Sequence, residues 1–166
     1  MKAISKRILD ACCGSRMFWF DKKNPDVEFV DCREFEDAQI WKSGDGKAVR
    51  YCSVKPDTVA DFTDLPFEDE TFYLVVFDPP HLVHVGKNSW LAKKYGRLTG
   101  DWREMLRKGF SECLRVLKSN GTLVFKWSET DISVKEILNI IGHTPLFGHK
   151  SGKQAKTHWM CFMKGA

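Results

Sequence analysis

The residues best suited to chemistry are Asp78, Pro79, Pro80 and His81, which stand where a short apolar run ends. That run, residues 73–77, predicts a buried strand that delivers a polar tip. Because proline fixes its own φ and favours extended backbone in the residue before it, Asp78 and the Pro79 carbonyl should keep one orientation. Two prolines also remove two backbone donors, which leaves a corner rich in acceptors. Such a corner suits an amino group with hydrogens to donate, and a solvated turn is the plainer alternative.

A second motif lies in residues 8–15, which read Ile-Leu-Asp-Ala-Cys-Cys-Gly-Ser. Its apolar start predicts a strand and its end a tight turn, where Gly14 lets backbone amides face a ligand. Together with the Asp-Pro-Pro-His string, this stretch resembles the amino-methyltransferases that use S-adenosylmethionine. The likeness is chiefly to enzymes that act on the exocyclic amine of adenine in DNA. It covers residues from about 7 to 81 by motif and extends to about 128 by the order of elements.

The resemblance implies a catalytic corner made of Asp78, Pro79, Pro80 and His81. Asp78 and the Pro79 carbonyl would accept the two hydrogens of the target amine. His81 would stack on the target base, although the family has Tyr, Phe or Trp at that position. An ordinary loop histidine is the alternative interpretation of His81.

The resemblance also implies S-adenosylmethionine as the cofactor and assigns its methionine end to Asp10 and the turn that follows. The residues of that turn are Cys12, Cys13, Gly14 and Ser15. Arg16 stands where the family often has another Gly. The chain has no Gly-x-Gly-x-x-Gly pattern and no Gly-Lys-Ser/Thr phosphate loop, which disfavours a dinucleotide dehydrogenase and a phosphate-loop enzyme.

Three further residues are expected to hold the nucleoside part of the cofactor. Asp31 ends the second predicted strand, 21 residues after Asp10, where nucleoside-binding α/β folds place an acid on the ribose hydroxyls. The resemblance assigns Asp61 to the adenine amine and Phe62 to the adenine ring. The alternatives are a turn cap for Asp31 and plain core packing for Phe62.

The charges of the chain are segregated, although its net charge is only +4. Residues 57–78 hold seven acids and no Lys or Arg, whereas residues 87–108 hold seven basic residues and two acids. After Glu136 no acid appears, while the chain has Lys150, Lys153, Lys156 and Lys164. This pattern predicts a cationic surface near the catalytic corner, and a solvated helix face with a basic tail is the alternative.

The loop from 85 to 100 mixes basic and aromatic side chains: Lys87, Trp90, Lys93, Lys94, Tyr95 and Arg97. Such a mixture offers phosphate contacts and base stacking, so we expect substrate contacts here. The partner is then a nucleic acid, with DNA favoured over RNA. A lid with a buried Trp90 and surface lysines is the alternative.

Strands alternate with helices along the chain. Strands are predicted at 7–11, 27–31, 58–61, 73–77 and 122–127, with another at 49–52 in a hairpin. Helices are predicted at 17–20, from Asp101 to a stop at Asn120 and Gly121, and from Ser133 to Gly142. Residues 144–148 and 157–163 could close the sheet as a hairpin. The order predicts an α/β fold: a Rossmann-like, doubly wound, mostly parallel sheet with an antiparallel C-terminal hairpin strand.

The 166 residues are expected to form a single domain, 1–166, that needs no disulfide or metal. The start has no signal-peptide apolar region and no stretch approaches a membrane span, so we expect a cytoplasmic protein without membrane partners. The six cysteines include no Cys-x-x-Cys pair and are expected to be reduced. A metal site from Cys12, Cys13, His81 and His84 fits no zinc spacing, so no metal is expected. The sequence leaves the oligomeric state open.

The function predicted from these patterns is methyl transfer from S-adenosylmethionine to an amino nitrogen, chiefly the exocyclic amine of adenine in DNA. RNA, a protein amide and a small amine stay open as substrates of the same fold. A nucleic-acid-binding module that has lost catalysis is the alternative from a different class.

Overall fold

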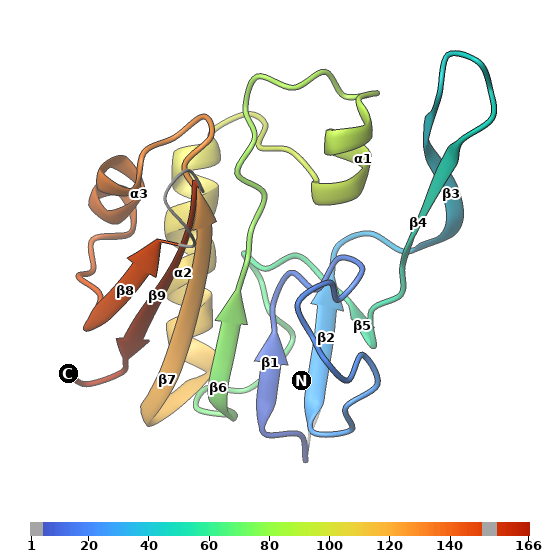
Figure 1. Cartoon of the computed structure of the whole chain (residues 1–166). Coiled ribbons are helices and arrows are strands. Elements are labelled where there is room, and N and C mark those ends of the chain that lie inside the picture. The colour runs from blue at the N-terminus through green and yellow to red at the C-terminus, as the bar shows by residue number, and fades with distance from the viewer. Residues whose placement is uncertain (1–4, 151–155) are drawn as a thin grey trace.

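The computed structural model describes residues 5–150 and 156–166. Lys153 of the predicted basic tail lies outside them, as do residues 1–4. A seven-stranded sheet has the order β5-β2-β1-β6-β7-β9-β8 (Figure 1). Its strands are β1 (Ile8–Asp10), β2 (Val27–Asp31), β5 (Thr58–Val59), β6 (Phe72–Phe77), β7 (Leu117–Ser128), β8 (Phe147–Lys150) and β9 (Thr157–Met163). Neighbours from β5 to β7 are parallel, whereas β9 is antiparallel to both β7 and β8. The predicted fold class is therefore confirmed.

The central strands of the sheet are buried. All five residues of β2 are buried, as are Leu9 of β1 and Val75 of β6. The rings of Phe77 and Phe125 stack with centroids 5.5 Å apart, in register on β6 and β7. Strands buried along their whole length are typical of parallel sheets, and β2 also buries the polar residues Glu28 and Asp31.

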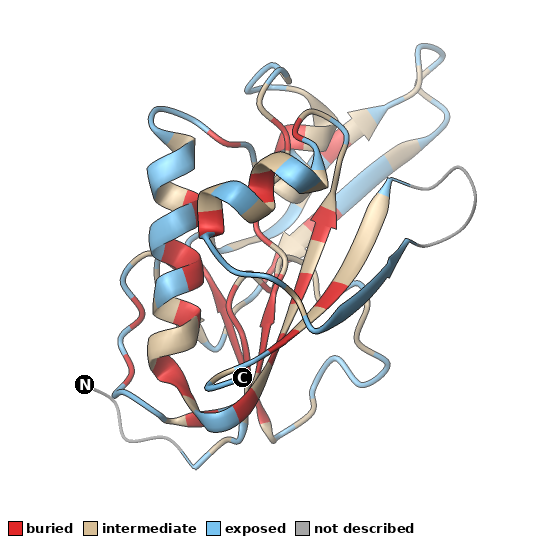
Figure 2. Ribbon diagram, turned by 90° about the vertical axis from the view of Figure 1, so that its left-hand side faces the viewer, coloured by how far each residue is buried: buried red, intermediate tan, exposed pale blue. Residues whose placement is uncertain are grey.

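Two helices pack on one face of the sheet. The first is α2 (Trp102–Val116), whose N-cap Asp101 accepts a hydrogen bond from the Glu104 amide at 3.2 Å. The second is α3 (Val134–Ile141), capped by Ser133 and ended by Gly142 at φ 70°. In Figure 2 the buried residues of α2 face the sheet and its exposed residues face outward. Both predicted helix starts are confirmed, and none of the described helices is long and apolar enough to cross a membrane.

The predicted helix at 17–20 is wrong. Residues 11–26 instead connect β1 to β2 through turns, with positive φ at Gly14 (49°) and Arg16 (55°). The Arg16 amide donates to the Cys13 carbonyl at 2.7 Å, which closes a turn between residues three apart, whereas an α-helix bonds residues four apart. The Trp19 indole then donates to Asp10 at 2.7 Å and fixes the connection against the end of β1.

A hairpin that only partly matches the prediction follows β2. Strand β4 (Val49–Val54) contains the predicted segment 49–52, but its partner β3 (Phe35–Lys42) was not predicted. The two form their own sheet, which projects from the body of the molecule in Figure 1. Half of the residues of β3 are exposed and only Ile40 is buried, so the strand lacks the apolar run by which buried strands are recognised.

Other boundaries also differ from the prediction: β8 is Phe147–Lys150 instead of 144–148, and β5 ends at Val59 instead of residue 61. The loop after β6 contains a short helix, α1 (Trp90–Tyr95), capped by Ser89 and ended by Gly96. Helix α2 ends at Val116, before the predicted stop at Asn120 and Gly121, because Leu117 is already extended and fully buried beside Phe72. Asn120, at φ 62°, therefore lies in an irregular part of β7.

Candidate functional site

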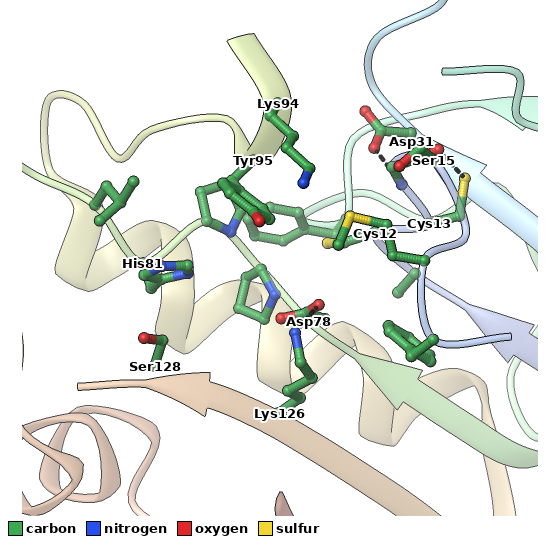
Figure 3. Close-up of a pocket in the computed structure, with 18 of the residues that line it drawn as sticks. Cys12, Cys13, Ser15, Asp31, Asp78, His81, Lys94, Tyr95, Lys126 and Ser128 are labelled. Carbon is green, nitrogen blue, oxygen red and sulfur yellow. Dashed lines mark hydrogen bonds and ion pairs between the residues drawn. The ribbon is translucent and has the colours of Figure 1, made fainter. Parts of the chain in front are cut away.

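A cavity of about 370 Å³ opens at the carboxyl ends of β1, β2, β6 and β7. Its walls come from the connection after β1, from Asp31 to Arg33, from the loop after β6, from α1 and from the end of β7 (Figure 3). This is the edge of a parallel α/β sheet at which ligands bind. The cavity is lined by all four residues of the catalytic corner predicted from the sequence: Asp78, Pro79, Pro80 and His81.

The floor of the cavity holds a close ion pair between Asp78 and Lys126. Because Phe77 and Phe125 point into the helix-covered core, the next residue of each strand points to the opposite face. The Lys126 Nζ donates to Asp78 Oδ2 at 2.6 Å. Burial raises the pKa of Asp78, and the nearby Lys126 ammonium limits that rise. Lys126 was missed by the sequence analysis, although its place between Phe125 and Trp127 in an alternating strand was a usable signal.

Pro80, the second proline of the corner, lies against Gly96 at the end of α1. Gly96, at the end of α1, has φ 75°, and a Cβ placed there would lie 3.0 Å from Pro80 Cγ. A hydrogen bond from the Leu98 amide to the Leu82 carbonyl at 2.8 Å joins the two ends of the segment that carries α1. The two prolines therefore shape the corner and also seat α1 above it.

Two aromatic side chains meet above the floor. The ring of His81 lies 6.1 Å from that of Tyr95 on α1 and 6.4 Å from that of Trp127. Burial lowers the pKa of His81, so its imidazole is neutral at pH 7. Figure 3 shows Tyr95 and Lys94 reaching from α1 on one side of the cavity and Lys126 on the other. A flat group that enters the cavity can thus contact aromatic faces and reach Asp78.

The turn after β1 is fastened to the end of β2. The Gly14 amide donates to Asp31 Oδ2 at 3.0 Å. Asp31 also accepts from the Arg33 amide at 2.9 Å, and from its Nε at 3.0 Å and Nη2 at 3.1 Å. Arg33 in turn donates to the carbonyl of Lys93 on α1 at 3.3 Å. Arg33 was not singled out in the sequence, yet it links Asp31, the predicted ribose acid, to α1.

The predicted cofactor residues fall into two groups. Those that line the cavity are Cys12, Cys13, Gly14, Ser15, Asp31 and Phe62. Asp10 and Asp61 do not line it. Asp10 is fully buried beneath the turn, where it accepts from the Cys12 amide at 3.2 Å and from the Trp19 indole. Asp61 is exposed and accepts from the amide and hydroxyl of Thr63, both at 2.8 Å.

Burial changes the titration of the groups around this turn. It raises the pKa of Asp10 to about 7, against the lowering effect of the Trp19 and Cys12 hydrogen bonds. It also raises the pKa of the Cys12 and Cys13 thiols, which therefore stay protonated at neutral pH. In the described parts of the chain, no three His, Cys, Asp or Glu side chains are grouped to hold a metal ion.

The predicted substrate residues also divide. Lys94 and Tyr95 line the cavity. Lys87, Lys93 and Arg97 are exposed and do not line it, and Trp90 is half-buried at the start of α1. The end of this segment therefore reaches the cavity, whereas Trp90 is half-buried and not buried as the alternative interpretation expected.

The fold has known relatives among solved structures, while no protein-family model and no curated protein sequence matches the chain. A protein from Pyrococcus horikoshii has a TM-score of 0.57 at 18% identity, over 95% of this chain and 81% of its own. The N-methyltransferase NodS from Bradyrhizobium japonicum has a TM-score of 0.53 at 14% identity, over 96% and 85%. A SAM-dependent methyltransferase from Methanosarcina mazei has a TM-score of 0.54 at 12% identity, over 95% and 92%. The chain therefore has the Rossmann-like fold of the class I S-adenosylmethionine-dependent methyltransferases.

Proposed function

We propose that this chain transfers the methyl group of S-adenosylmethionine to an amino nitrogen, and that its substrate is the exocyclic amine of adenine in DNA. The observation that carries the proposal is the position of Asp78 and Pro79. They stand at the carboxyl end of β6, inside the cavity that the turn after β1 also lines. An acid in that place can receive an amine directly beside a bound cofactor.

The cofactor would be held by the turn at Gly14, by Asp31 and by Phe62. The turn offers small residues and backbone amides, and Asp31 is a carboxylate suited to ribose hydroxyls. Phe62 is 7% exposed and gives one apolar wall of the cavity. When bound, S-adenosylmethionine supplies an electrophilic methyl group on a sulfonium.

The chemical task of the protein is to restore the nucleophilicity of an amine whose lone pair is delocalised into a ring. Asp78 Oδ2 is engaged by Lys126, but among the described residues Oδ1 has no hydrogen-bond partner. Oδ1 and the Pro79 carbonyl can therefore accept the two amine hydrogens, which favours a tetrahedral nitrogen and stabilises its developing positive charge. The remaining contribution is positioning.

The target base would be held by stacking. His81 is neutral and lies beside Tyr95, so the two rings together offer the aromatic surface that the family draws from one Tyr, Phe or Trp. An adenine in a duplex must leave the helix to reach this depth, and the aromatic pair gives it a stacking partner. Exposed Lys87, Lys93 and Arg97 belong to the same segment as Tyr95 and suit phosphate contacts.

The test of the chemistry is methyl transfer from labelled S-adenosylmethionine to an adenine-containing duplex, with the product identified as methylated adenine by mass spectrometry. Asp78→Ala should lower kcat by about 100-fold or more, since preorganised electrostatic groups are worth about that much. Its cofactor affinity should stay within about twofold of the parent. Asp64→Ala removes an exposed acid outside the cavity and is the matched control. Full activity of Asp78→Ala would defeat the assignment.

The test of the substrate class is the salt dependence of DNA binding. Reversing Lys93 and Lys94 to Glu should weaken binding and reduce the slope of log affinity against log salt by about 1 to 2. The control pair is Lys22 and Lys23, which are also adjacent and exposed but precede β2, at the opposite end of the sheet. Equal effects of the two reversals would point away from a DNA surface at α1.

A further inference from the structure

The floor of the cavity presents a hydrogen-bond acceptor and a donor side by side. Asp78 and Lys126 follow the in-register pair Phe77 and Phe125 on adjacent parallel strands. Both side chains line the cavity, and their charged atoms are 2.6 Å apart. The pair carries no net charge when Asp78 is ionised. A bound group therefore meets an acceptor and a donor at neighbouring positions.

Lys126 has hydrogen-bonding capacity that the protein does not use. An ammonium has three N–H donors, and within the described residues Nζ donates only to Asp78. Its other neighbours are the rings of Phe18 and Trp159, with centroids 5.6 and 5.7 Å from Nζ. The two rings confine the ammonium without accepting a conventional hydrogen bond. Donors therefore remain for a ligand in the cavity.

We propose that Lys126 is a specificity residue that donates to a ring nitrogen beside the target amine. The inference rests on the proposed function and deepens it. While Asp78 accepts from the amine, Lys126 would bind the acceptor next to it, so that the pair reads one edge of an aminopurine or aminopyrimidine. An alkylamine satisfies only half of this arrangement, because it is protonated at neutral pH and carries no neighbouring acceptor.

Lys126 only donates a hydrogen bond and takes no part in the proton transfer. The amine lone pair forms the new N–C bond as the C–S bond breaks, and the electron pair of that bond remains on sulfur as a neutral thioether. The nitrogen becomes positive and then loses one proton to Asp78 or to water. A donor at the ring nitrogen also holds the base in register, so its loss should reduce kcat/KM.

The experiment compares two proteins, the parent chain and Lys126→Met, on three substrates. The substrates are a DNA duplex with adenine at the methylated position and duplexes in which 1-deazaadenine or 7-deazaadenine replaces it, so that one neighbouring ring nitrogen is missing. The parent chain should lose about 10-fold to 100-fold in kcat/KM on one of the two analogues, the scale of a hydrogen bond to a charged group. Lys126→Met should lose as much on adenine and then show no further loss on that analogue.

Two variants separate recognition from a merely structural role. Lys126→Arg retains a donor and a charge, so it should recover part of the discrimination. Lys94→Met changes the other lysine that lines the cavity, from the side of α1, and should leave the ratio between substrates as in the parent. The ratio also cancels any loss of folded protein, because both substrates meet the same preparation.

The outcomes distinguish this inference from the proposed function. A parent chain that methylates adenine and both analogues equally well, or a Lys126→Met chain that discriminates as the parent does, would overturn the inference alone. Preference for spermidine over adenine would overturn this inference together with the adenine substrate of the proposed function, while leaving methyl transfer to an amine intact. Cofactor binding without methyl transfer to duplex, glutamine peptide or spermidine would defeat the proposed function and this inference together.

Discussion

Gly109 of α2 packs against Phe62, a residue that also lines the cavity. A Cβ at this buried glycine would lie 2.6 Å from Cε2 of Phe62 and 3.1 Å from Cζ of Phe77. Real Cβ contacts below 3.0 Å are essentially never seen, so Gly109→Ala must displace a ring. Phe62 is the one that lines the cavity, and its ring centroid is 5.3 Å from that of Phe77 in an edge contact. The substitution should therefore push Phe62 toward the cofactor space.

The expected stability change is a balance of two effects. Alanine is better than glycine inside a helix by about 1 kcal/mol. Overpacking of a core costs about 1 to 3 kcal/mol, and the short contacts place Gly109 toward the upper part of that range. We expect Gly109→Ala to lower the free energy of unfolding by about 1 kcal/mol despite its higher helix propensity.

The assay combines urea unfolding with calorimetric titration of S-adenosylmethionine. Gly109→Ala should weaken cofactor binding by about 10-fold, the equivalent of a displacement cost near 1.4 kcal/mol. Adding Phe62→Leu, which shortens the displaced side chain, should recover part of the stability. Lys108→Ala, at an exposed neighbouring position of α2, is the control and should change stability by less than about 0.5 kcal/mol. A Gly109→Ala chain that is as stable as the parent and binds the cofactor equally well would refute this reasoning.

Three further predictions follow from the site and its supports. Asp10 has a raised folded-state pKa of about 7, so the stability that its protonated form contributes is complete below about pH 4 and is lost as the pH rises through 7. Asp10→Asn should flatten that part of the stability profile, which amounts to about 4 kcal/mol at most, and an unchanged profile in urea unfolding would contradict it. Arg33→Gln removes a competitor from Asp31, so calorimetry should show cofactor binding about fivefold tighter, and weaker binding would count against Asp31 as the ribose acid. Ser133→Ala removes the cap of α3 and should cost about 1 kcal/mol in thermal unfolding without changing cofactor affinity, and a change in affinity would contradict a purely structural role.

The elements that could be predicted are those whose pattern is local. The Asp101 and Glu104 cap and a regular apolar face predict helix α2, and an apolar run that ends in prolines predicts β6. Strand β3 could not be predicted, because only Ile40 in it is buried and it pairs only with β4. The end of α2 at Val116 is decided by burial of Leu117 against β6, which local propensity does not report.

The site shows the same division. Asp78 is recognisable from its own neighbours in sequence. Lys126 and Arg33 are not, because their roles depend on partners that the fold places beside them, Asp78 for Lys126 and Lys93 for Arg33. Lys126 is 48 residues from Asp78, and only the pairing of β6 with β7 makes them partners. Asp10 has the sequence context of a ligand residue, but burial and the Trp19 indole turn it into a support for the turn.

The measurement that tests the central claim most directly is calorimetric titration of the chain with S-adenosylmethionine, with and without an adenine-containing DNA duplex. We predict saturable binding at about micromolar concentration, lost in Asp31→Ala and retained in the exposed control Asp64→Ala. The folded parent chain failing to bind in either condition would contradict the account, and binding that survives Asp31→Ala unchanged would place the ligand elsewhere.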